Sequence, residues 1–410
     1  MGKSTFFTGQ PIISQILSLI PKAMVRRLSK EHNTDYYCKK FKTYDHLVTM
    51  LFCSFHHCTS LRELITGLQA NAHRLYHLGI IHTPRRSTLA DANERRSADF
   101  FQALFHELYK HFYGRLPDSL HKKKLIEKVF IVDSTTVTLF SEILKGAGTY
   151  GTNGKKKGGV KAHVLVRAKD DTPCFVRITA ASKADNHIMP LLDLPRGSVL
   201  VMDKGYNSYK QMALWTRSKI NWITRLTKGA VWELLEEKPV SEANKKLGIR
   251  SDKIILLGSK KARRKEPVQK VRLVTFYDQA ADREFYFLSN NMNYSPLTIA
   301  NLYKRRWEIE ILFKRIKQNF QLSSFLGDNQ NAIKIQLWCT LIADLLIKVI
   351  KDRAEKKSNS KKWSFSNLAG LIRQHLTTYI DLLKFLTNPD QAIIGYAKEV
   401  VSQQLLLFKT

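Results

Sequence analysis

The stretch VFIVDSTT, residues 129–136, decides the fold class. Its first four residues are apolar and mostly β-branched, and the polar residues after them begin at Asp133. A short, continuous apolar run of this kind is typical of a strand buried on both faces. Similar runs follow at residues 159–166, 175–180, 198–202 and 220–225, with a helix expected over residues 207–218. This order predicts an α/β protein with a mixed sheet.

Two of the predicted strands end at an aspartate. Asp133 closes the first strand, and Asp203 closes the run over residues 198–202. For either residue alone, the simpler interpretation is a turn or a helix cap. In a mixed sheet, however, neighbouring strands end side by side, so both carboxylates can emerge at one edge. Hard carboxylate oxygens suit Mg²⁺ or Mn²⁺, and two such ions catalyse phosphodiester chemistry.

A third carboxylate lies on a helix predicted to begin at Ser295-Pro296 and to extend to about Phe320. At about 100° per residue, one polar stripe about 80° wide on this helix carries five residues, namely Tyr303, Arg306, Glu310, Lys314 and Lys317. The stripe borders an apolar stripe that must face a core. Ordinary charge pairs on a surface helix explain Glu310 and Lys314, but not the alignment of Tyr, Arg, Glu and Lys over four turns.

The composition indicates a nucleic-acid partner. The 410 residues include 67 Lys and Arg against 35 Asp and Glu, a formal net charge of +32. Such an excess repels itself unless an anion neutralises it, and the phosphate backbone is the commonest anionic partner. The most apolar stretch, residues 337–350, is too short to span a membrane. Five scattered cysteines fit a reducing cytosol, so we predict a cytoplasmic, nucleoid-associated protein of bacterial type that has no membrane partner.

The chain on either side of the predicted sheet has a different periodicity. Helical spacing and basic residues over the first 120 residues predict a DNA-end-binding domain, although a solvated helix face has the same pattern. Residues 228–290 have strand-like periods and predict an inserted β domain. The predicted domains are therefore residues 1–120, the first core part 121–227, the inserted β domain 228–290, the second core part 291–352, and a helical C-terminal region 353–410.

The motifs around Asp133, Asp203 and Glu310 resemble those of one branch of the DDE insertion-sequence transposases. The spacing Tyr303-x₂-Arg306-x₃-Glu310-x₆-Lys317 is similar to the Tyr-Arg-Glu-Lys signature of that branch. The sequences DKGY, residues 203–206, and VDST, residues 132–135, resemble the family's surroundings of the second and first aspartates. The long gap between Asp203 and Glu310 is also similar, because this branch carries an inserted β domain there.

The resemblance implies a ribonuclease H-like core and a cut-and-paste DNA transposase. Asp133, Asp203 and Glu310 would be catalytic and would bind two Mg²⁺ ions, with Mn²⁺ as a substitute. The enzyme would nick the transposon end, form a hairpin and then join the element to target DNA. Tyr303, Arg306 and Lys317 would hold phosphates, with help from Lys314. Double-stranded DNA, as terminal inverted repeats and target, is the implied partner of a homodimer in the end-bound complex.

In this branch an aromatic side chain of the inserted β domain stacks on a flipped base. The candidates are Trp222, Trp232, Phe285 and Tyr286, of which the last two lie closest in sequence to the Tyr303 helix. His163 is a candidate neighbour of the metals. The alternatives are a metal-dependent nuclease of the same core fold that cuts without joining, and a non-catalytic DNA-binding derivative. The Tyr-Arg-Glu-Lys signature argues against the nuclease. The presence of all three carboxylates argues against the non-catalytic DNA-binding derivative.

Overall fold

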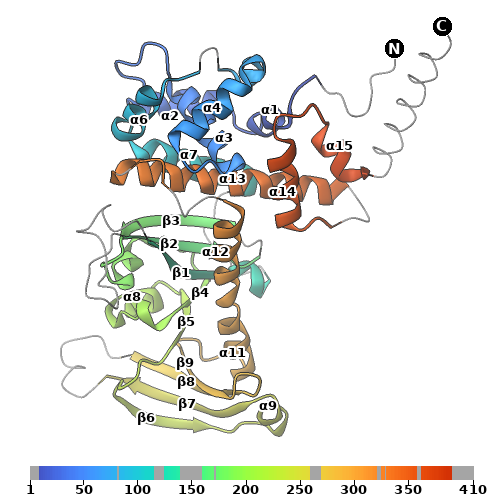
Figure 1. Ribbon diagram of the computed structural model, residues 1–410. Coiled ribbons are helices and arrows are strands. Elements are labelled where there is room, and N and C mark those ends of the chain that lie inside the picture. Colours follow the sequence, from blue (N-terminus) through green and yellow to red (C-terminus); the bar gives the residue numbers. More distant parts are fainter. Residues whose placement is uncertain are drawn as a thin grey trace, which may run out of the picture. The chain divides into compact units, whose positions relative to one another are not determined.

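The computed structural model describes residues 9–80, 83–114, 124–138, 159–169, 172–258, 269–320, 325–327, 329–357 and 362–389. The chain forms two compact units (Figure 1). One unit contains residues 1–114 and 315–410, and the other contains residues 115–314. The glycine-rich stretch 146–158 and the basic run 260–265 lie outside the described residues.

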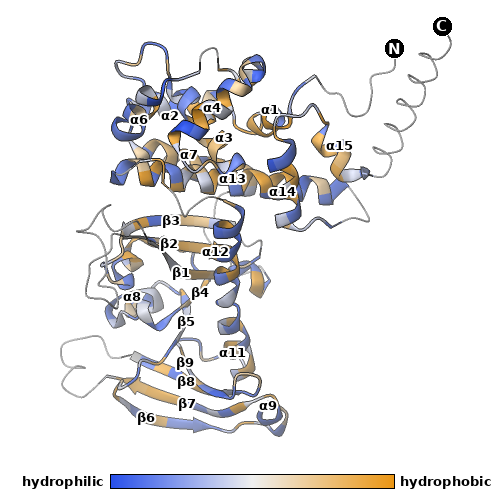
Figure 2. Cartoon of the chain, in the orientation of Figure 1, coloured by the Kyte–Doolittle hydropathy of each residue, from blue (hydrophilic) through white to orange (hydrophobic). Residues whose placement is uncertain are grey.

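The first unit is helical. Its N-terminal helices are α1 (Ile12–Leu17), α2 (Lys22–Glu31), α3 (Thr43–His56), α4 (Leu61–Ala70), α5 (Leu75–Leu78), α6 (Arg86–Arg95) and α7 (Ala98–Tyr113). Its C-terminal helices are α13 (Gln330–Lys357), α14 (Phe365–His375) and α15 (Leu382–Thr387). The long helix α13 packs against α3 and α7, and the apolar residues of these three helices, whose ribbon is orange in Figure 2, form a buried core. Distant parts of the sequence thereby share one core, which the hydrophobic effect stabilises.

The apolar spacing of residues 90–113, with Phe100, Phe101, Leu104, Leu108 and Phe112 on one stripe, predicts one helix, but the structure has two, α6 and α7. Arg96 lies between them with an extended backbone, and the Ser97 hydroxyl accepts a hydrogen bond from the Asp99 N–H. Ser97 is therefore an N-cap that begins a new helix. The prediction of one continuous helix was wrong because the apolar periodicity persists across this break.

The second unit is built on a nine-stranded sheet with the order β3-β2-β1-β4-β5-β9-β8-β7-β6. The strands are β1 (Val129–Thr138), β2 (Gly159–Arg167), β3 (Thr172–Ala180), β4 (Val199–Met202), β5 (Asn221–Arg225), β6 (Trp232–Lys238), β7 (Ile249–Leu257), β8 (Gln269–Asp278) and β9 (Arg283–Ser289). Strands β1, β4 and β5 are parallel, and every other pairing is antiparallel. The order 3-2-1-4-5 is that of a ribonuclease H-like core, so the predicted mixed α/β class is confirmed.

Strands β6 to β9 extend the same sheet, because β9 pairs with β5. Two smaller elements complete this region, α8 (Tyr209–Arg217), which packs on β5, and the short helix α9 (Glu242–Lys246). The sequence did not predict β6, whose residues WELLEEK lack the alternation of a half-buried strand and are almost all exposed.

The helix that follows the sheet is fixed at its start. Arg272 on β8 and Asp252 on β7 form a buried ion pair at 2.5 Å. Arg272 also donates to the carbonyls of Met292 and Tyr294, just before α11 (Pro296–Lys304). Helix α11 in turn contacts β5, β8 and β9. The end of the sheet therefore positions the helix that carries Tyr303.

Candidate active site

Two aspartates lie next to each other because of the strand register. In the parallel pair of β1 and β4, Val132 lies opposite Met202. The next residues, Asp133 and Asp203, therefore lie next to each other where the parallel pairing ends. Asp133 does not end its strand as predicted, because β1 continues to Thr138 in its antiparallel pairing with β2. Asp203 follows β4 and accepts a hydrogen bond from the Gly205 N–H at 3.4 Å.

The helix predicted from Ser295 to Phe320 is interrupted after Lys304. Helix α11 ends there, and α12 (Trp307–Asn319) begins three residues later. At the junction the Arg306 N–H donates to the Tyr303 carbonyl at 2.9 Å and the Glu308 N–H to the Arg305 carbonyl at 2.9 Å. These are i to i−3 bonds, tighter than those of an α-helix. The prediction of one continuous helix was therefore wrong between Lys304 and Trp307.

The junction places Arg306 between two carboxylates. Its Nη1 donates to Asp133 at 2.6 Å and its Nη2 to Glu310 at 2.8 Å. Only 8% of Arg306 is exposed. One guanidinium therefore links a strand of the core to a helix that is 170 residues or more further along the chain.

Two other side chains donate hydrogen bonds to Asp203. The Arg225 Nη2 lies 2.6 Å from Asp203 Oδ1, and the Tyr303 hydroxyl donates to the same oxygen at 3.3 Å. The structure thus brings together five of the predicted residues, Asp133, Asp203, Glu310, Tyr303 and Arg306. Lys314 is exposed on α12, and Lys317 belongs to the helical unit.

The two aspartates differ in their electrostatics. Burial raises the pKa of Asp133 from 3.8 to about 6, and the neighbouring Asp203 and Glu310 add to this effect, which the Ser134 N–H and Arg306 oppose. Burial alone would also raise the pKa of Asp203, but Arg225, Arg306 and the Gly205 N–H together outweigh burial and lower that pKa. Burial raises the pKa of Tyr303 to about 12, so this hydroxyl stays protonated and remains a donor. Of the two aspartates, Asp133 therefore holds its proton more readily.

The donor set suits a hard divalent cation, because all three acidic side chains offer carboxylate oxygens. Among the residues that the structure describes, however, no three His, Cys, Asp or Glu side chains lie close enough together to hold one metal ion. Arg306 supplies the positive charge between Asp133 and Glu310 instead. A divalent cation would compete with this guanidinium for the same oxygens.

A fourth carboxylate, Asp185, lies beside the site and was not predicted. Its Oδ1 accepts hydrogen bonds from the Ser134 hydroxyl at 3.2 Å and from Lys161 at 2.9 Å. Its Oδ2 is 3.2 Å from the point where a Cβ on Gly205 would lie, and an Asp203 oxygen is 4.0 Å from the same point. Asp185 therefore packs against the residues that follow both aspartates. The glycine in DKGY, which leaves room for this close approach, was the one sequence signal of it.

His163 lies behind this network. Its Nδ1 is 3.8 Å from Asp185 and 3.1 Å from the Tyr206 hydroxyl, and its Nε2 is 2.9 Å from the Thr179 hydroxyl. The side chain is fully buried, and burial lowers its pKa to about 4. His163 is therefore a neutral ring that links β2, β3 and the turn after Asp203.

The four aromatic candidates separate by exposure. Trp222 is fully buried and its Nε1 donates to the Met212 carbonyl at 3.2 Å, so this candidate is a core residue. Phe285 is 8% exposed and stacks on Phe287. Trp232 and Tyr286 are 36% and 44% exposed. Both line a pocket of about 480 Å³ whose cations are Lys204, Arg225, Lys228, Lys253 and Arg283.

Comparison with known proteins places this site in a family. A model of the "Transposase DDE domain" matches residues 124–346, which include all three carboxylates. The chain belongs to this family. It is a DDE transposase of the insertion-sequence kind. None of its described helices has both the length and the apolar character needed to cross a membrane.

The relatives of this transposase carry matching names. "Putative transposase y4zB" of Sinorhizobium fredii is 30% identical over 65% of this chain and 72% of its own length. "Probable transposase for insertion sequence element IS5377" of Geobacillus stearothermophilus is 27% identical over 56% of this chain and 58% of its own length. A cryo-EM structure of piggyBac transposase in a synaptic complex with hairpin DNA has 10% identity and a TM-score of 0.45 over 93% of this chain and 80% of that one. That score is too low to argue from. A model named "Domain of unknown function (DUF4372)" matches residues 8–81.

The raised pKa of Asp133 predicts a pH-dependent gain in stability for Asp133→Asn. The folded state disfavours the ionised acid, so the wild type loses stability as pH rises from below 4 through about 6. Asparagine stays neutral, and the variant should therefore unfold with a free energy about 1–3 kcal/mol higher at pH 7.5 in EDTA. Denaturant titrations at pH 7.5 and pH 4 measure this, because the gain should disappear at the lower pH. Equal stability at pH 7.5 would contradict the assignment.

Asp185→Ala should slow DNA cleavage about 10- to 100-fold, a typical cost of losing a residue that orients catalytic ligands. The change leaves Lys161 without its carboxylate and removes the contact against Gly205. DNA affinity should be unchanged within about twofold. The matched control is Asp193→Ala, an exposed aspartate of the same segment, which should cleave at the wild-type rate. Equal rates for the two variants would remove Asp185 from the site.

Proposed function

We propose that this transposase excises and inserts its element by cut-and-paste, through a hairpin at the transposon end. The supporting observation is the convergence of Asp133, Asp203 and Glu310 around Arg306 and Tyr303. These five residues come from three distant segments and match the aspartate motifs and three of the four signature positions of the Tyr-Arg-Glu-Lys branch. A stand-alone nuclease does not have to hold the cut DNA end after cleavage, so it does not require these signature residues.

Asp133, Asp203 and Glu310 are the residues that would hold two Mg²⁺ ions, with Mn²⁺ as a substitute. When bound, these ions would supply the activation of the attacking oxygen and the stabilisation of the leaving oxygen. The protein's own contribution is to bring the three carboxylates to one place and to balance their charge. Arg225 and Tyr303 orient Asp203 through hydrogen bonds to a single oxygen.

Arg306 has two roles in this proposal. Its guanidinium offsets the charge of Asp133 and Glu310. The same guanidinium would hold a DNA phosphate by two parallel hydrogen bonds. Lys314 and Lys317 would contact phosphates further along the DNA as point charges.

The hairpin step would use the pocket lined by Trp232 and Tyr286. A tight hairpin turn requires a base to leave the stack, and an exposed aromatic ring provides a surface for it. Arg225 lines this pocket and also contacts Asp203, so the pocket adjoins the catalytic carboxylates. The surrounding lysines and arginines would hold the phosphates of the turn.

The partners in this proposal are the terminal inverted repeats and the target DNA. Two transposon ends must be held together, which favours a homodimer in the end-bound complex. The helical N-terminal region, residues 1–120, would recognise the end, and residues 353–410 remain a predicted helical C-terminal region.

The test is an assay of the full chain with Mg²⁺ on labelled terminal-repeat DNA. Nicks followed by hairpins and joined products support the transposition pathway, nicks alone support the nuclease, and bound but intact DNA supports the non-catalytic derivative. Glu310→Gln should abolish cleavage, because it removes a metal ligand, while DNA affinity stays within about twofold. The control Glu308→Gln changes a neighbouring acid that pairs with Arg305 and should cleave normally. Wild-type cleavage by Glu310→Gln would mean that another carboxylate holds the metal.

Tyr286→Ala should reduce hairpin formation about 10-fold and leave the first nick unchanged, because only the hairpin requires a flipped base. Gel analysis of nicked and hairpin products over time measures both steps. Trp232→Ala, tested in parallel, identifies which of the two rings makes the contact. Leu235→Ala is the control, since Leu235 is 46% exposed on β6 but does not line the pocket. Normal hairpin yields from both aromatic variants would overturn the role of this pocket.

A further inference from the structure

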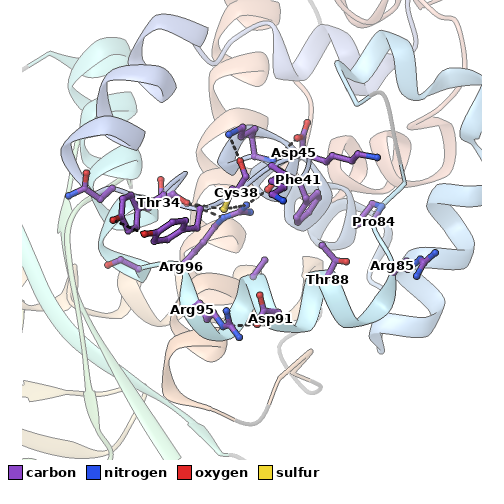
Figure 3. A pocket seen from close by; sticks show the side chains of 18 of the residues that line it. Thr34, Cys38, Phe41, Asp45, Pro84, Arg85, Thr88, Asp91, Arg95 and Arg96 are labelled. Atoms are coloured by element: carbon purple, nitrogen blue, oxygen red, sulfur yellow. Dashed lines mark hydrogen bonds and ion pairs between the residues drawn. The ribbon is translucent and has the colours of Figure 1, made fainter.

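A groove of about 1220 Å³ lies on the helical unit, between the segment 32–45 and the segment 83–97 that contains α6 (Figure 3). About half of the residues that line it belong to the loop that joins α2 to α3. That loop falls within residues 8–81, the part of the chain matched by the domain of unknown function. The groove contains none of the residues assigned to the active site.

The lining is strongly basic. Six lysines and arginines line the groove against two aspartates, namely Lys39, Lys40, Lys42, Arg85, Arg95 and Arg96 against Asp45 and Asp91. Asp91 already pairs with Arg95 at 2.7 Å, and Lys39, Lys40 and Arg85 are exposed. The surface therefore has an excess of positive charge that a polyanion can neutralise.

The loop is held in place by buried polar contacts. Asp35 accepts hydrogen bonds from the Thr43 N–H at 2.6 Å, from the Thr43 hydroxyl at 2.8 Å and from Ser29 at 2.9 Å. Arg96 donates to the Thr34 carbonyl at 3.3 Å and also to the Phe41 carbonyl. Both ends of the loop are thus tied to the helices around it, which a merely solvated basic turn does not require.

The same loop presents two aromatic rings to solvent. Tyr36 is 71% exposed and Tyr37 is 88% exposed, with their ring centroids 4.2 Å apart. Tyr37 has a φ of +53°, a left-handed conformation that is unfavourable for a bulky side chain. A strained backbone conformation at a residue whose side chain stays exposed is typical of a site that contacts another molecule.

The groove also contains an unused donor. Arg96 is 6% exposed, and its Nη1 is buried without a hydrogen-bond partner among the described residues. Buried donors of this kind are rare in folded proteins and are normally satisfied by a ligand or water when the chain does not satisfy them. A guanidinium N–H is well suited to an anionic oxygen.

We propose that this groove is a binding site for duplex DNA. Lys39, Lys40 and Arg85 lie along the phosphate backbone, and the rings of Tyr36 and Tyr37 pack against sugar and base edges. The combination of exposed cations and exposed aromatics is the reason for preferring a nucleic acid to an acidic protein. The inference rests on the proposed function, because it takes transposon-end DNA to be the ligand, and it assigns a role to the region matched by the domain of unknown function.

The first test measures binding of the full chain to a fluorescent terminal-repeat duplex in EDTA, where no cleavage occurs. The double variant Lys39→Ala/Lys40→Ala should bind about 10-fold or more weakly. The slope of log K against log salt should become shallower by about 2, because two phosphate contacts are lost. The control Arg26→Ala/Arg62→Ala removes two exposed cations of the same unit that do not line the groove, and its affinity should change less than about twofold. An unchanged salt slope in the Lys39/Lys40 variant would overturn the proposal.

The second test separates contact from folding. Tyr37→Gly removes the ring and also relieves the positive φ, so the melting temperature should equal or exceed that of the wild type. DNA affinity should nevertheless fall several-fold. A variant that melts lower and binds normally would assign Tyr37 a structural role instead.

The two proposals fail in different ways. Wild-type protein that binds DNA through the groove but makes no nicks with Mg²⁺ contradicts the proposed function and leaves the groove assigned. Protein that cleaves while the Lys39/Lys40 variant binds with unchanged affinity and salt slope contradicts the groove alone.

Discussion

One guanidinium determines the organisation of the active site. Arg306 contacts Asp133 on the sheet and Glu310 on the following helix, and it is almost completely buried. The Asp133 side chain is 15% exposed, whereas that of Glu310 is 56% exposed. The two carboxylates repel each other, and the guanidinium between them offsets this repulsion. The interruption between α11 and α12 contributes to this arrangement. The tighter backbone there brings the Arg306 side chain close to both Tyr303 and Glu310.

The two aspartates are therefore prepared differently for a metal. Asp203 already has Arg225 and the Tyr303 hydroxyl on one oxygen, and its pKa is lowered. Asp133 shares its only guanidinium with Glu310, and its pKa is raised to about 6. The strand register therefore presents two carboxylates of different acidity at one edge of the sheet.

Sequence reasoning could predict most of the core but less of the site. The strands that lead to Asp133 and Asp203 are continuous apolar runs, so their burial follows from simple periodicity, whereas their parallel register does not. Strand β6 has no alternation and could not be recognised. The break at Arg305 and Arg306 depends on contacts with the sheet, which local helix propensity does not contain. Asp185 belongs to no periodic segment, and only the close approach at Gly205 indicates it. Trp222 could not be separated from Tyr286, because both lie in strands and only tertiary packing decides which ring is covered.

The cationic side chains of this protein have different roles around the three carboxylates and in the groove of the helical unit. Around the carboxylates, arginines and Lys161 are mostly buried and paired, so they offset a local negative charge that would otherwise repel the phosphate backbone. In the groove of the helical unit, Lys39, Lys40 and Arg85 are exposed, whereas Arg95 pairs with Asp91 and Arg96 lies near Asp35 and Asp45. Exposed cations contribute to affinity through the counterions they release, and paired cations contribute little. The net charge of +32 is therefore a poor measure of DNA affinity by itself, because part of the positive charge is already paired within the protein.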